Sequence, residues 1–78
     1  MNIIVLGTGC AKCKMLDQLT RKVVTDLNLD AQVVKEEDIT KILRYGILRT
    51  PGLVVDGKII LSGRIPSEHE LKELLTQQ

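Results

Sequence analysis

Aromatic residues are nearly absent from this chain of 78 residues, which has no tryptophan, no phenylalanine and a single tyrosine, Tyr45. Proteins that bind single-stranded nucleic acid stack the bases on aromatic side chains, and this chain has no set of rings to offer. An excess of one charge is also missing, because 11 basic and 10 acidic residues leave a net charge of +1. We therefore expect neither nucleic acid nor an anionic membrane as a partner.

Long apolar runs are missing as well. The run Ile3–Leu6 has four residues, far fewer than the roughly 20 of a membrane-spanning helix. The start of the chain has no basic segment of the kind that opens a signal peptide. A domain of this size buries only about 60% of its unfolded surface, which leaves no room for a second domain. We expect residues 1–78 to form one domain, a cytoplasmic monomer that does not bind membranes.

Cysteine is scarce, and both copies belong to one motif, Cys10-Ala11-Lys12-Cys13. The motif follows the glycine-rich turn Gly7-Thr8-Gly9 and opens a segment with helical periodicity. Unpaired amide groups and the positive end of the helix dipole favour a thiolate over a thiol at such a position. In a chain without an export signal, this spacing indicates a catalytic or metal-binding pair and not a structural disulfide.

The residue pattern predicts the order strand, helix, strand, helix, strand, strand, helix. The predicted strands cover residues 2–6, 31–36, 53–55 and 58–61, and the helices begin near residues 10, 38 and 67. Asp56-Gly57 fits the two-residue type I′ turn of a hairpin. Asp38 is a suitable cap for the second helix, and Ser67 with Glu70 forms a capping box for the third. The first helix turns one apolar stripe toward the core, consisting of Leu16, Leu19, Val23 and Leu27.

This order, with the Cys-x-x-Cys motif after the first strand and an X-Pro bond before the third, resembles a minimal thioredoxin-like domain. The segment Tyr45–Lys58 resembles the part of thioredoxin that runs from the second helix through the cis-proline into the terminal hairpin, and Ser62-Gly63 resembles its continuation. The whole chain is most similar to the small redox-active disulfide proteins of archaea and bacteria, which are glutaredoxin-sized. The resemblance implies an α/β fold, β-α-β-α-β-β-α, with a four-stranded mixed sheet flanked by three helices.

The resemblance also implies roles for the site residues. Cys10 is the exposed thiol that attacks, and Cys13 is the deeper thiol that resolves the mixed disulfide. The Thr50-Pro51 bond is expected to be cis and packed against the disulfide, with the Thr50 backbone open to a substrate strand. Cis X-Pro costs only about 0.5 to 1 kcal/mol relative to trans, so packing can select it. By its residues alone, Pro51 could instead simply end strand pairing at an edge.

Three further side chains have chemistry that a site of this kind can use. The ammonium of Lys12 would lower the pKa of Cys10 if it faces the sulfur, or else it extends into water where salt screens it. His69 falls in the first turn of the last helix, where we expect a solvated side chain and not a proton donor or metal ligand. Tyr45 is expected to pack in the core as the only aromatic ring available to it.

Several positions depart from the related families. No tryptophan precedes Cys10, the residues inside the motif are Ala-Lys and not Gly-Pro, and the first strand lacks the buried acid that assists proton transfer in thioredoxins. Ser62-Gly63-Arg64 stands in place of the glutathione-binding Gly-Gly-x-Asp of glutaredoxins, although Arg49 or Lys12 could meet a carboxylate. Activity on the usual thioredoxin partners and use of glutathione therefore stay open.

The predicted function is that of a thiol-disulfide oxidoreductase, which cycles between the dithiol and the Cys10–Cys13 disulfide and passes electrons to a protein disulfide. No cofactor is expected, so a partner reductase must supply the electrons. The alternative is a carrier of Cu(I) or Zn(II), because the segment 7–13 also resembles the metal loop of heavy-metal-associated domains and soft thiolates suit these ions. Two features argue against a metal carrier. Heavy-metal-associated domains end on a strand, whereas the last predicted element here is a helix, and no second cysteine pair completes a four-ligand zinc site. A module that senses redox state would use the same two thiols.

Overall fold

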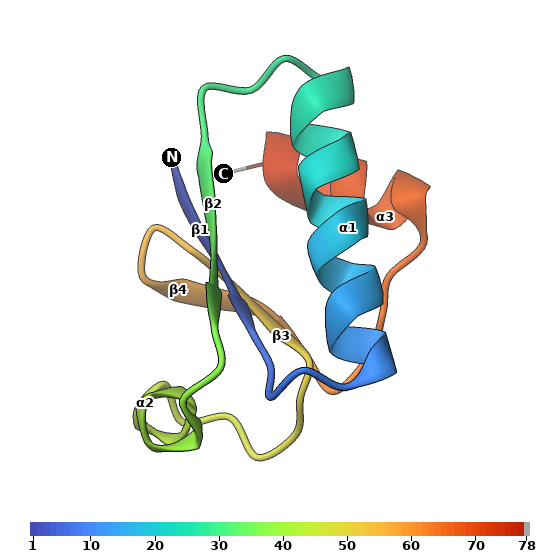
Figure 1. The fold of residues 1–78 in the computed structure, drawn as a ribbon. Coiled ribbons are helices and arrows are strands. Elements are labelled where there is room, and N and C mark those ends of the chain that lie inside the picture. The colour runs from blue at the N-terminus through green and yellow to red at the C-terminus, as the bar shows by residue number, and fades with distance from the viewer. Residues whose placement is uncertain (78) are drawn as a thin grey trace.

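The elements of the chain follow the predicted order in a computed structural model that describes residues 1–77 (Figure 1). They are β1 (Asn2–Leu6), α1 (Ala11–Asp26), β2 (Gln32–Glu36), α2 (Ile39–Arg44), β3 (Gly52–Val55), β4 (Lys58–Ser62) and α3 (Glu68–Thr76). The predicted thioredoxin-like fold is confirmed. Among the described residues, no helix is long and apolar enough to cross a membrane.

The four strands form one mixed sheet in the order β2-β1-β3-β4. β1 pairs in parallel with β2 and antiparallel with β3, and β3 pairs antiparallel with β4. β1 therefore lies inside the sheet, as its continuous apolar run predicts, while β2 is an edge strand. The hairpin turn has positive φ at both Asp56 (49°) and Gly57 (83°), which is the backbone of the predicted type I′ turn.

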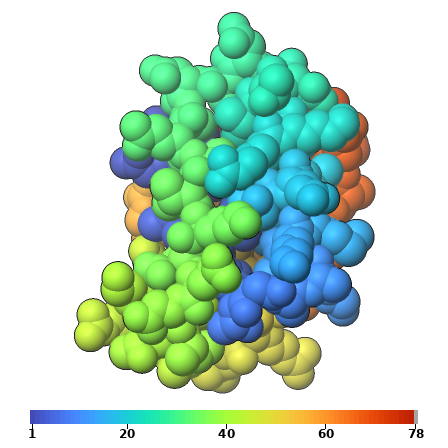
Figure 2. Space-filling model, viewed as in Figure 1, coloured from blue at the N-terminus to red at the C-terminus, as the bar shows by residue number. Residues whose placement is uncertain are grey.

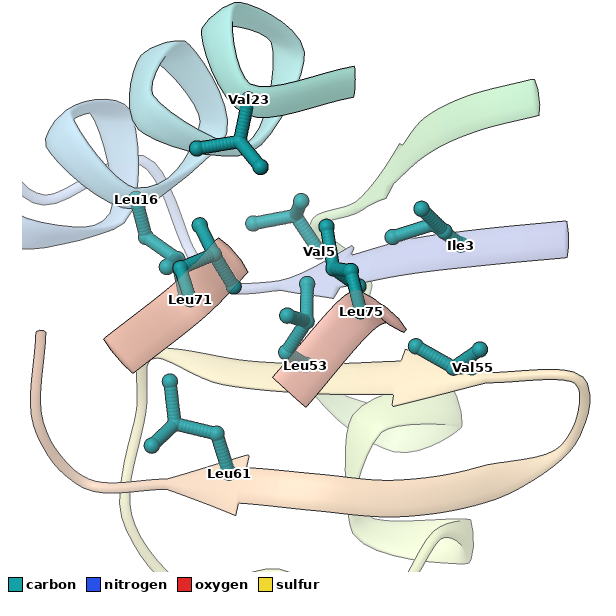
Figure 3. Packing of buried hydrophobic residues seen from close by; sticks show 9 residues of the cluster. All are labelled: Ile3, Val5, Leu16, Val23, Leu53, Val55, Leu61, Leu71 and Leu75. Carbon is teal, nitrogen blue, oxygen red and sulfur yellow. The ribbon is translucent and has the colours of Figure 1, made fainter. Parts of the chain in front are cut away.

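The alternation of side chains along β1 divides the core between the two faces of the sheet. Ile3 and Val5 point to the face covered by α1 and α3, where the main core lies (Figure 3). That core consists of Ile3, Val5, Leu16, Val23, Leu53, Val55, Leu61, Leu71 and Leu75. The opposite face carries a smaller cluster beneath α2, made of Leu6, Ile42, Ile47 and Val54. Tyr45, the only Phe, Trp or Tyr residue of the chain, packs against this second cluster, as expected.

Side-chain caps fix where the two later helices begin. The Asp38 carboxylate accepts a hydrogen bond from the Thr40 amide at 2.9 Å, and the Ser67 hydroxyl accepts one from the Glu70 amide at 3.0 Å. In a complete capping box, the Glu70 carboxylate would accept a hydrogen bond from the Ser67 amide. Here this carboxylate accepts two hydrogen bonds from Arg64, at 2.8 and 2.5 Å. A bidentate pair of charged groups is stronger than one bond to a backbone amide, which accounts for the difference.

The strand register decides which loops meet at the end of the sheet. Leu6 at the end of β1 lies opposite Gly52 at the start of β3. Segment 7–10, which follows β1, and segment 48–51, which precedes β3, therefore lie at the same end of the sheet (Figure 1). In the space-filling view, the blue start of α1 and the yellow segment after α2 meet on the lower surface of the molecule (Figure 2). The cysteine motif and the Thr50-Pro51 bond therefore lie at the same end of the sheet.

Candidate active site

Cys10 occupies the N-cap position of α1, with extended backbone angles (φ −70°, ψ 167°). Serine, threonine, aspartate or asparagine usually accepts a hydrogen bond from the first free amides of a helix at this position. Here the sulfur takes that role, and Cys10 Sγ accepts from the Cys13 amide at 3.3 Å. The Cys10 side chain is exposed, so a sulfur that receives hydrogen bonds is also open to a partner.

The two cysteines differ in burial and in acidity. A hydrogen bond from the Cys13 thiol lowers the pKa of Cys10 most, and the backbone amides of Cys13 and Lys12 lower it further. Cys13 is only 5% exposed, and burial is the main cause that raises its pKa, followed by its hydrogen bond to Cys10. The negative charge is therefore placed on the outer sulfur and the proton on the inner one.

The Thr50-Pro51 peptide bond is cis, which confirms the expectation for this bond. Pro51 is fully buried, and its carbonyl oxygen accepts a hydrogen bond from the Gly63 amide at 2.8 Å. Thr50 is half-buried beside it. The bond is thus held between the sheet and the segment that follows β4, at the same end of the molecule as Cys10.

Comparison with known proteins agrees with this geometry. A family model described as a thioredoxin domain matches residues 1–76. A protein of Methanothermobacter thermautotrophicus described as thioredoxin is 41% identical over 76 residues, which cover 97% of this chain and 99% of that protein. A protein of Methanocaldococcus jannaschii with the same description is 40% identical over 73 residues, which cover 94% of this chain and 84% of that protein.

The chain belongs to the thioredoxin domain family. Its Cys10 and Cys13 form the Cys-x-x-Cys pair of a thiol-disulfide oxidoreductase, which confirms the activity that the sequence predicts. The residues between the two cysteines are Ala11 and Lys12, and the pair lies at the start of α1.

The remaining candidate residues of this thioredoxin-family site lie apart from the two sulfurs or act through the backbone. Lys12 is exposed, and the effect of this residue on the pKa of Cys10 comes from its backbone amide. His69 is a solvated residue, as expected, with 85% of its side chain exposed and Nε2 3.0 Å from the Glu73 carboxylate. Within residues 1–77, no group of three or more histidine, cysteine, aspartate or glutamate side chains is placed to hold a metal ion.

The sequence pattern does not single out Asp17, a buried acid one turn after Cys13. Its carboxylate accepts a hydrogen bond from Arg21 Nε at 3.1 Å and lies 3.8 Å from Lys35 Nζ on β2. Lys35 also lines a cavity of about 140 Å³, together with Gly7, Cys13 and Glu37 among other residues. The i, i+4 spacing of Asp17 and Arg21 indicates an ion pair, but only the packing of α1 on the sheet shows that the carboxylate is buried.

Proposed function

We propose that this protein reduces protein disulfides in the cytoplasm, with Cys10 as the attacking thiol and Cys13 as the resolving thiol. One observation carries the assignment: the exposed sulfur at the N-cap has a lowered pKa and the buried sulfur beside it has a raised one. The thiolate is the nucleophile in disulfide exchange, so the thiol that ionises first and meets solvent is the one that attacks.

The reaction has two exchanges. In the first, the Cys10 thiolate attacks one sulfur of the substrate disulfide, a Cys10–substrate disulfide forms, and the other substrate sulfur leaves as a thiolate. In the second, Cys13 loses its proton and attacks Cys10 Sγ, which forms the Cys10–Cys13 disulfide and releases the second substrate thiolate. Two electrons pass to the substrate, and a partner reductase with a dithiol of its own restores the reduced pair.

The neighbourhood of the thiols supports this assignment. The cis Thr50-Pro51 bond lies at the end of the sheet where segment 7–10 emerges, and we propose that these two residues shape the groove in which a substrate strand binds. Lys12 supports the Cys10 thiolate through its backbone amide. The protein works as a monomer without a bound cofactor, and an unpaired dithiol of this kind suits a reducing compartment.

Trapping of partners tests the two roles. Tagged Cys13→Ser protein, added to the cytosol of the native organism, retains mixed disulfides because it has no internal thiol to break them, and reductant elutes the bound partners. Tagged Cys10→Ser protein is the matched control and traps little. Equal trapping by both variants would reverse or abolish the assignment, and recovery of many partners in place of one would indicate a general reductase.

A metal assay separates the oxidoreductase from a metal carrier. The wild-type protein is expected to form a monomeric Cys10–Cys13 disulfide reversibly, with a reduction potential of roughly −300 to −120 mV in glutathione or dithiothreitol buffers. The reduced protein is not expected to keep Cu(I) or Zn(II) through gel filtration against a modest chelator. Retention of one ion per chain by wild type, lost in Cys10→Ser, would favour the carrier.

A further inference from the structure

Gly7 lies directly against the side chain of Cys13. It follows β1, is buried, and donates its amide hydrogen to the Glu36 carbonyl oxygen at 2.9 Å. A Cβ atom built on Gly7 would stand 2.4 Å from Cys13 Sγ and 2.6 Å from Cys13 Cβ. Ordinary contacts of a Cβ atom begin near 3.4 Å, so a side chain at Gly7 and the present position of Cys13 exclude each other.

The backbone of Gly7 does not itself require glycine. Four other glycines of the chain have positive φ, namely Gly9, Gly46, Gly57 and Gly63, but Gly7 is not among them. A left-handed backbone is therefore not the reason for glycine at this position. The need for glycine at this position therefore comes from the space that the Cys13 side chain fills.

We propose that Gly7 is a positioning residue that seats the inner sulfur of the redox pair against the end of β1. The missing side chain leaves room for Cys13 Sγ below the first turn of α1, where it is buried and hydrogen-bonded to Cys10. This proposal rests on the proposed function, because it assumes that Cys13 performs the second exchange.

The position of Cys13 Sγ matters most for the second exchange, in which this sulfur is the attacking atom. In that step Cys13 Sγ attacks Cys10 Sγ, the Cys10–Cys13 bond forms, the thiol proton goes to solvent, and the substrate sulfur leaves with the electron pair of the broken bond. In Gly7→Ala, Cys13 Sγ must move by about 1 Å or more to reach ordinary contact. A displacement of this size can slow a reaction about 100-fold. The attack by Cys10 forms no bond to Cys13 and depends on it only through the hydrogen bonds that lower the Cys10 pKa.

Rapid mixing of the reduced protein with the aromatic disulfide dithiobisnitrobenzoate measures both steps in one trace. Attack by Cys10 releases one coloured thionitrobenzoate, and resolution by Cys13 releases the second. At a pH high enough to ionise Cys10 in both proteins, we expect Gly7→Ala to slow the second release by up to about 100-fold and to change the first far less. Titration of Cys13 in the Cys10→Ser background should show a lower pKa in Gly7→Ala, because the thiol leaves its buried seat.

Gly52→Ala is the matched control. Gly52 is also buried and free of positive φ, and it lies opposite Leu6 on the neighbouring strand. Its added Cβ would stand 2.9 Å from Ile47 Cδ1 and touch neither cysteine. We expect Gly52→Ala to lower stability and to leave the ratio of the two releases as in wild type. An unchanged ratio in Gly7→Ala, or an equal change in Gly52→Ala, would overturn the proposal.

Three further variants keep the test decisive. If Gly7→Ala does not fold, the free energies of unfolding of Cys13→Gly and of Gly7→Ala/Cys13→Gly decide, because removal of the Cys13 side chain should make Gly7→Ala tolerable. A double variant that also fails to fold would overturn the proposal.

Cys13→Ser reports on the proposed function separately: it should give only the first release, and two releases from it would refute the resolving role of Cys13 whatever Gly7 does.

Discussion

The outer and inner sides of the first two turns of α1 differ more than their short sequence suggests. The outer side carries the exposed Cys10, Lys12 and Met15, and the inner side carries the buried Cys13 and Leu16. Only three positions separate the two cysteines, yet one has a lowered pKa and the other a raised one. Burial and hydrogen bonding, and not the kind of residue, divide the chemistry between two identical thiols.

The same comparison shows how the site is coupled to the core. Leu16 and Val23 hold the inner side of α1 on the main core beside Val5 and Leu71, so the helix cannot turn without exposing them. The orientation that buries Leu16 also buries Cys13 and leaves Cys10 at the surface. The assignment of thiolate and thiol therefore depends on the hydrophobic packing of the helix.

The largest contrast between the two sides should appear in stability. Leu16 is fully buried, and Leu16→Ala is expected to lower the free energy of unfolding by about 2–5 kcal/mol. Its neighbour Met15 is 55% exposed, and Met15→Ala should change stability by no more than about 0.5 kcal/mol. Urea unfolding of the reduced proteins measures both values. Equal losses in the two variants would contradict the orientation of α1.

The next contrast is in the reactivity of the two thiols with pH. In Cys13→Ser, the pH at which alkylation of Cys10 by iodoacetamide reaches half its plateau should lie below the ordinary pKa of a thiol, because backbone amides still lower the Cys10 pKa. In Cys10→Ser, the corresponding midpoint for Cys13 should lie above the ordinary pKa of a thiol, because burial raises the Cys13 pKa. For each unit by which the Cys13 pKa exceeds the Cys10 pKa, Cys13 has about tenfold less thiolate than Cys10 at acidic pH. Coinciding pH profiles would remove the distinction.

A smaller effect should show which groups lower the pKa of Cys10. The hydrogen bond from the Cys13 side chain is the largest of them, so Cys13→Ala should raise the pKa of Cys10 toward its ordinary value. Cys13→Ser keeps a hydroxyl donor at the same position and should raise it less. The absorbance of the Cys10 thiolate as a function of pH measures both variants. A Cys10 pKa that is the same in both would show that the inner side chain has no part in the shift.

The smallest effect is expected at Lys12. Lys12→Ala keeps the backbone amide that contributes to the lowered pKa of Cys10 and removes only an exposed ammonium. We expect a rise in the Cys10 pKa that is smaller than that in Cys13→Ala and that disappears at high salt, where exposed charges are screened. A rise equal to that in Cys13→Ala would make the ammonium a main cause. Thiolate absorbance at low and high ionic strength gives the comparison.

Local sequence patterns predict most of the fold because they have local physical causes. Asp56-Gly57 adopts positive φ at both residues, Asp38 and Ser67 cap their helices, and the apolar run of β1 lies inside the sheet. The Arg64–Glu70 pair is different, because it replaces half of a capping box by a contact that the local pattern does not show. A motif predicts which bonds a segment can make, and competing partners decide which bonds form.

By itself, the sequence determined the order of the elements, the position of the redox pair at a helix start and, through resemblance, the cis bond before Pro51. These follow from hydrophobic periodicity, capping residues and motif spacing, which act over a few neighbouring residues. Only the tertiary structure decided that Asp17 is buried beside Lys35 and that Gly7 lies against Cys13. One contact joins α1 to β2, and the other joins α1 to the residue that follows β1. The geometry of both depends on the rotation and position of the helix on the sheet, which the packing of the whole core fixes.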